Sequence, residues 1–264
     1  MTDTQRMATA LAAFARLGWR EAAADRAGLL GRSLLFSIPV LVFAAIWRVT
    51  PLDGASHDAD RLIWYVTVTE AIIFSVGYVF REIETDISSG AIESALTRPL
   101  PYVLARLAED AGGTALRLTA LGCVGAGIAW AVTGVVPFAP SAVPVLILAA
   151  AMGAVIGLLF QIVIGFLAAW VGNPAPAYWI WQKLVFVVGG LFIPLTLYPA
   201  WLGDLGRETP FAAILFHPAS LVMDARPEAI LGILLRQGLW LIFAALLVAA
   251  AAIAATRRFV REGV

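Results

Sequence analysis

"AVPVLILAAAMGAVIGLLFQIVIGFLAAWV", residues 142–171, contains no charged side chain. A helix that crosses about 30 Å of hydrocarbon needs about 20 apolar residues, so this stretch is long enough to span a bilayer. The rest of the chain has a similar character, because 61% of its 264 residues are hydrophobic and only 14% are charged. Soluble domains have about 25% charged residues. We therefore predict that lipid surrounds most of this chain.

The apolar segments predict an all-α integral membrane protein with about six transmembrane helices in one domain, residues 1–264. Helices satisfy their own backbone hydrogen bonds and can therefore cross hydrocarbon. The fifth candidate span is the weakest, because Lys183 lies near its start and Pro194 and Pro199 near its end. The candidate spans are residues 33–50, 62–80, 114–136, 142–171, 177–197 and 229–255.

The basic residues predict the orientation, since Lys and Arg are enriched in cytoplasmic loops. The smaller set would lie outside and comprises Arg48, Arg61, Arg207, Arg226 and Arg236. The larger set comprises Arg6, Arg16, Arg20, Arg26, Arg32, Arg81, Arg98, Arg106, Arg117, Lys183, Arg257, Arg258 and Arg261. Both termini are therefore predicted to be cytoplasmic.

Residues 1–32 predict a helix at the cytoplasmic interface. On a helical wheel an apolar side and a basic side separate, as in helices that lie on a membrane surface. A solvated leader helix is the alternative. The apolar side comprises Met7, Leu11, Phe14 and Leu17, and the basic side Arg6, Arg16 and Arg20.

Residues 81–112 form the only sizeable predicted cytoplasmic loop, and its charges are of both signs. Ser88 or Ser89 can cap a short helix over residues 90–98, which Pro99 and Pro101 then limit. Such a helix suits docking to another protein. The residues alone leave this interpretation and that of a solvated connector open.

The stretch "FREIETDISSGAIESALTRPLP", residues 80–101, resembles the cytoplasmic loop of permease subunits of type-2 ATP-binding-cassette (ABC) exporters. The stretches "GGLFIPLTLYPAWL", residues 189–202, and "PFAAILFHPASLV", residues 210–222, resemble the segment before the last span in that family. The closest similarity is to a bacterial subgroup in which two different permeases accompany one ATPase. The resemblance places the ATPase-coupling helix on Arg81, Glu82, Glu84, Gly90, Glu93 and Pro99.

The resemblance also implies partners: two copies of a cytoplasmic ABC ATPase, and a second permease chain in a heterodimer or a homodimer. This chain has no P-loop, because its only lysine, Lys183, lies between Gln182 and Leu184. ATP and Mg²⁺ are therefore expected on the ATPase. We expect no catalytic residue, metal site or nucleic-acid partner, since no ligand spacing is evident for His57 and His217 and the net charge is zero.

Glu70 is a carboxylate near the middle of the second predicted span. A charge there costs about 2.5–3.5 kcal/mol on insertion scales and indicates a functional residue. It can line a substrate path, bind a cation, pair with Arg48 or Arg61, or hold helices together. An ion-coupled secondary transporter that uses Glu70 is the alternative to the exporter.

Gly153, Gly157, Gln161 and Gly165 recur every four residues and form one stripe along a helix. Small residues let helices approach closely, so packing within the bundle is the default interpretation. A dimer contact or a wall of the transport pathway is the alternative.

Residues 194–228 are too rich in proline for a span and too apolar for a free loop. Irregular backbone at membrane depth must be covered by protein or line a cavity. We therefore predict re-entrant outer helices, with an outer gate at Pro194, Pro199, Trp201 and Phe216. An interfacial aromatic anchor is the alternative.

Together with these features, the resemblance to type-2 ABC exporters implies a permease that exports a hydrophobic or amphipathic molecule, such as a drug, lipid or peptide. The membrane would be the bacterial inner membrane, and the energy would come from ATP hydrolysed by the separate subunit.

Overall fold

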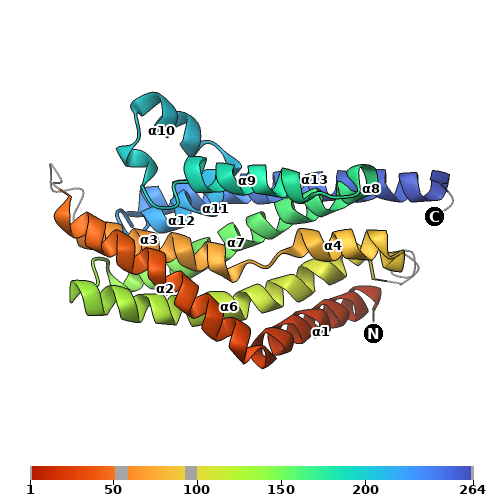
Figure 1. Ribbon diagram of the computed structural model, residues 1–264, viewed down its shortest axis with the longest axis horizontal. Helices are drawn as coiled ribbons and strands as arrows, with labels where there is room; N and C mark the ends of the chain where they lie inside the picture. Colours follow the sequence, from red (N-terminus) through yellow and green to blue (C-terminus); the bar gives the residue numbers. More distant parts are fainter. Residues whose placement is uncertain (1, 51–58, 93–99, 263–264) are drawn as a thin grey trace.

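The computed structural model describes residues 2–50, 59–92 and 100–262, and this part of the chain contains helices and no strand. The long helices lie side by side in one bundle (Figure 1). The start of α1 (Asp3–Ala24) and the end of α13 (Pro227–Glu262) lie at the same end as α4 (Val79–Ser88), as the predicted orientation requires. The short helix α10 (Ala200–Arg207) lies toward the opposite end (Figure 1).

Five helical segments of the described chain are long and apolar enough to cross a membrane. They correspond to the first, second, third, fourth and sixth predicted spans, so the chain is a multi-pass membrane protein. The segments are Arg26–Val49 (α2), Ala59–Ser88 (α3, Ala59–Ser75, with α4), Tyr102–Thr133 (α6), Pro140–Val171 (η1, Pro140–Ala142; α7, Val143–Phe166; α8, Ala168–Val171) and Pro227–Phe259 within α13.

The predicted fifth span, residues 177–197, is wrong in its extent. The helix there, α9 (Ala175–Val188), has 14 residues. At 1.5 Å per residue it covers roughly 21 Å, less than the hydrocarbon core. The chain turns after it because Gly190 adopts φ +71°, a conformation that glycine tolerates best. A Cβ at Gly189 would lie 2.2 Å from the Val185 carbonyl oxygen, so the turn also needs a residue without a side chain.

The N-terminal helix α1 packs lengthwise against the first part of α6 (Figure 1). A Cβ at Gly18 would lie 1.9 Å from the carbonyl oxygen of Glu109, and one at Gly112 would lie 1.9 Å from that of Ala15. The two backbones are therefore in direct contact. Asp25 accepts from the Gly28 amide at 2.9 Å and starts α2 earlier than the predicted residue 33. The position of α1 relative to a membrane surface stays a prediction.

The segment after α9 comprises η2 (Leu195–Leu197), α10, α11 (Pro210–Ile214) and α12 (Phe216–Ser220). α10 projects from the bundle, whereas α11 and α12 fold back into it (Figure 1). α11 and α12 are buried against α3 and α7. Gln237 of α13 ties this segment in place, because its amide nitrogen donates to the carbonyl oxygens of Ala149 and Ala213, both at 2.9 Å. Sequence reasoning missed this residue.

Candidate functional site

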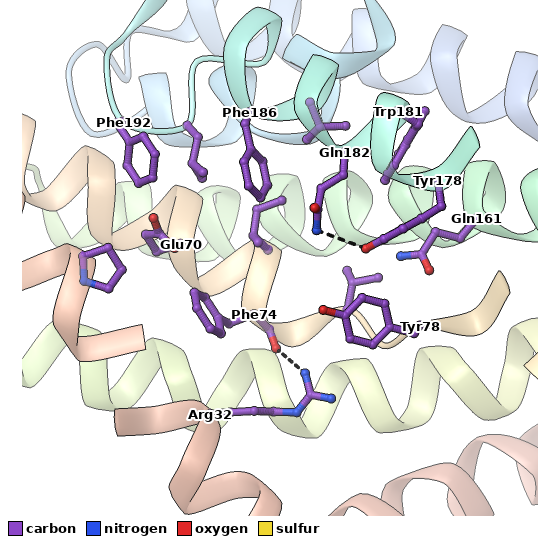
Figure 2. Close-up of a pocket in the computed structure, with 15 residues that line it drawn as sticks. Arg32, Glu70, Phe74, Tyr78, Gln161, Tyr178, Trp181, Gln182, Phe186 and Phe192 are labelled. Carbon is purple, nitrogen blue, oxygen red and sulfur yellow. Dashed lines mark hydrogen bonds between the residues drawn. The ribbon is translucent and has the colours of Figure 1, made fainter. Parts of the chain in front are cut away.

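A pocket of about 300 Å³ lies between α2, α3, α7, α9 and the turn after α9 (Figure 2). Its wall is formed mainly by apolar and aromatic side chains with a few polar groups, the usual composition of a small-molecule site. The principal lining residues are Arg32, Glu70, Phe74, Tyr78, Gln161, Tyr178, Trp181, Gln182, Phe186 and Phe192. The pocket brings together two of the predicted pathway residues, Glu70 and Gln161.

Glu70 extends from α3 into this pocket and is only 2% exposed (Figure 2). Among the described residues its carboxylate has no hydrogen bond and no ion pair. The pairing with Arg48 or Arg61 that the sequence allowed is not formed, because Arg48 donates to the carbonyl of Val132 and Arg61 donates to that of Met223 at 3.2 Å. A buried carboxylate without a protein partner is costly unless a ligand, a proton or water compensates for it.

Gln161 is the second polar group of the pocket that lacks a partner. It is 3% exposed, and its Oε1 accepts no hydrogen bond from the described residues. The glycines of the same stripe pack within the chain: a Cβ at Gly153 would lie 2.4 Å from the Ile214 carbonyl oxygen, and one at Gly165 would lie 2.8 Å from Cβ of Ile83. Gly157 is looser, with its closest such neighbour at 4.0 Å. The stripe thus combines helix packing with one pocket residue.

Aromatic rings from α3, from α9 and from the non-helical segments that follow each of them surround the polar groups. Tyr78 and Tyr178 meet edge to face with ring centroids 5.7 Å apart, and Trp181 lies 6.0 Å from Tyr178. Gln182 donates to the Tyr178 hydroxyl at 3.3 Å, which orients that ring (Figure 2). These rings could not be assigned to one site from the sequence, because α9 and α3 come together only in the fold.

In the wall of the pocket, helix α3 ends at Ser75 and the chain resumes as α4 at Val79. Two arginines satisfy the carbonyls left free at this break: Arg32 donates to Phe74 at 3.1 Å, and Arg117 donates to Ser75 at 2.6 Å. Cations at a helix C-terminus also interact favourably with the helix dipole. The sequence alone predicted one continuous span over residues 62–80; Gly77, which lies within the break, is the residue that could have indicated it.

The predicted coupling residues differ in their environment. Glu82 forms an ion pair with Arg106 of α6 at 2.7 Å, and Arg106 also binds Asp86 at 2.7 Å. Arg81 is exposed, with its guanidinium 5.6 Å from the Tyr78 ring centroid, and Glu84 is partly exposed without a hydrogen bond or ion pair to the described residues. Gly90 ends the turn after α4 with φ +74°. Glu93 and Pro99 lie outside the described residues.

The predicted outer-gate residues are not gathered at one place. Pro194 and Pro199 precede η2 and α10 as their N-caps. Trp201 on α10 is 71% exposed, whereas Phe216 on α12 is 6% exposed and lies 6.5 Å from the Tyr65 ring. Trp201 lies on the exposed outer rim that α10 forms, whereas Phe216 lies in the interior of the bundle. Any gate would therefore involve residues at two separate positions.

Fold and site define a multi-pass helical membrane protein with a pocket lined mainly by apolar and aromatic side chains and with a charged helical extension at one end. Residues 52–264 match the model of a family described as ABC-2 family transporter protein, and the chain belongs to that family. It is therefore an ABC permease, the membrane component of a transporter that works with an ABC ATPase. A comparison with curated proteins found no significant match.

Proposed function

We propose that this chain is the permease subunit of an ATP-driven exporter that moves hydrophobic or amphipathic molecules out across the bacterial inner membrane. Two copies of a separate cytoplasmic ATPase would bind ATP and Mg²⁺. A second permease chain, different or identical, would complete the pathway. Both termini and the end of α4 would then face the cytoplasm. Membership of the ABC-2 family supports this proposal and does not favour the ion-coupled carrier.

The connection between α4 and the pocket is the observation that carries the mechanism. α4 is bound to α6 by Arg106, which contacts both Glu82 and Asp86. Tyr102, also on α6, donates to Asp86 at 2.6 Å. A force applied to α4 is therefore transmitted to α6, because these contacts hold the two helices together.

The push would reach the pocket through the break between α3 and α4. α3 carries Glu70 and Phe74 in the pocket wall, and its last carbonyls are held by Arg32 and Arg117. When the ATPases close on ATP, α4 and α6 would move together and α3 would tilt at residues 76–78. The pocket would then open toward the outer side, where α10 and Trp201 form the rim.

Reversing the charge of Glu84 tests the docking surface. Since Glu84 has no ion pair within the described residues, Glu84→Arg should leave the permease folded but place a cation against the basic groups expected on the ATPase. Like charges in such a contact cost several kcal/mol. We expect the ATPase to copurify at less than about a tenth of its normal ratio to the permease.

Glu228→Arg is the matched control, because Glu228 is an exposed acid at the opposite end of the bundle. It should retain the ATPase at the wild-type ratio. Full copurification of the ATPase with Glu84→Arg, at normal expression, would show that the exposed face of α4 contacts water and not the ATPase.

A further inference from the structure

The pocket contains a carboxyl group, that of Glu70, which forms no ion pair with the residues that the structure describes. Glu70 and Arg32 are its two charged lining residues among those described. Arg32 is already engaged, because it donates to the Phe74 carbonyl at the C-terminal end of α3, where the helix dipole is negative. Lys183, on the neighbouring helix α9, is exposed and is not part of the lining. The Glu70 carboxyl is therefore available to pair with a cationic ligand.

The rest of the wall is suited to a cation with an apolar body. Aromatic faces attract cations, most strongly where water is excluded. Phe74, Phe186 and Phe192 lie along the pocket near Glu70, while Trp181 and Tyr178 line the part next to Gln161 (Figure 2). The Oε1 atom of Gln161, buried and without a partner, adds a neutral acceptor that suits a positive group.

We propose that this pocket binds a lipophilic organic cation, with Glu70 as the counter-ion and the aromatic wall holding the apolar body. That such a cation is the exported substrate rests on the proposed function, whereas its binding does not. The pocket volume of about 300 Å³ is at the lower end of the range for drug-sized ligands, about 300–1,000 Å³. A compact cation fits this volume better than a long-chain lipid or a peptide.

Two ions of the same shape and opposite charge test the proposal. Tetraphenylphosphonium and tetraphenylborate are titrated into the purified permease in nanodiscs of neutral lipid, without ATPase or ATP, and binding to empty nanodiscs is subtracted. The phosphonium should bind about tenfold more tightly than the borate. Equal binding of the two ions, or tighter binding of the borate, would overturn the proposal.

Matched variants locate the site. Glu70→Gln should weaken phosphonium binding about tenfold and abolish the discrimination between the ions, while the exposed Glu208→Gln should change neither. Trp181→Leu should weaken phosphonium binding about fivefold, while Trp201→Leu, on the exposed rim, should not. Unchanged phosphonium binding by folded Glu70→Gln also contradicts the proposal. If that variant does not fold, the comparison of the two ions on the wild-type protein decides.

The two proposals can fail separately. Because these titrations use no ATPase, a negative result removes the cation site and leaves the exporter intact. Conversely, normal copurification of the ATPase with Glu84→Arg would count against the proposal that the ATPase docks on α4. It would leave the proposed cation site in the pocket untouched.

Discussion

Arg106→Met is expected to lower the free energy of unfolding by about 2–3 kcal/mol and to separate α4 from α6. The Arg106 side chain is 18% exposed and binds two carboxylates of α4, Glu82 and Asp86, each at 2.7 Å. Breaking a fully buried pair costs about 3–5 kcal/mol, and the 49% exposure of Glu82 reduces that value. Without the guanidinium, two like charges one turn apart would face α6 unopposed.

Thermal unfolding in detergent measures the effect, with a fall of the melting temperature of at least about 5 °C expected for Arg106→Met. Arg207→Met is the control, since its pair with Asp204 is more exposed and should contribute no measurable stability. Adding Asp86→Asn to Arg106→Met should restore part of the loss. Equal melting temperatures for Arg106→Met and Arg207→Met would show that the α4–α6 ion pairs do not brace the coupling region.

Gly153→Ala is expected to lower the free energy of unfolding by about 1–3 kcal/mol, because the new methyl group overpacks the contact between α7 and α11. The Cβ would lie 2.4 Å from the Ile214 carbonyl oxygen, which belongs to the backbone and cannot rotate away. α11 must therefore shift, which would also disturb the Gln237 bond to Ala213. Hydrogen exchange of residues 210–220 should become faster.

Gly157→Ala is a control on the same face of the same helix, one turn further along. Its Cβ would have its closest such neighbour at 4.0 Å, so the substitution should be neutral or stabilising, given the higher helix propensity of Ala. Similar stability of the two variants would mean that α11 does not approach α7 as closely as the fold requires.

Hydropathy predicted five of the spans because the cost of placing a residue in lipid depends on that residue and its immediate neighbours. The same reasoning extended α9 too far. Residues 189–197 are apolar enough to continue a span, but a Cβ at Gly189 would lie 2.8 Å from the Phe211 carbonyl oxygen of α11, a close approach that only the fold creates. Local composition therefore could not place the end of this helix.

The site was predictable in part. Glu70 and Gln161 were recognisable as polar residues inside apolar spans, which are costly and so indicate a function. The aromatic wall was not, since its rings come from segments about 100 residues apart in the chain, such as Tyr78 and Tyr178. Arg106 was counted only as a positive charge, and nothing in the sequence showed which carboxylates it would bind.

Cross-linking from α4 tests the central claim most directly, namely that an ABC ATPase docks at this end of the permease. A photoreactive benzoyl-phenylalanine is placed at Glu84, or at Trp201 as the control on the opposite rim, and adducts formed in native membranes are identified by mass spectrometry. We expect the residue at position 84 to capture an ATPase subunit that carries a P-loop, and the residue at position 201 to capture none. Capture of the ATPase from position 201, or its absence from the adducts at position 84, would contradict the account.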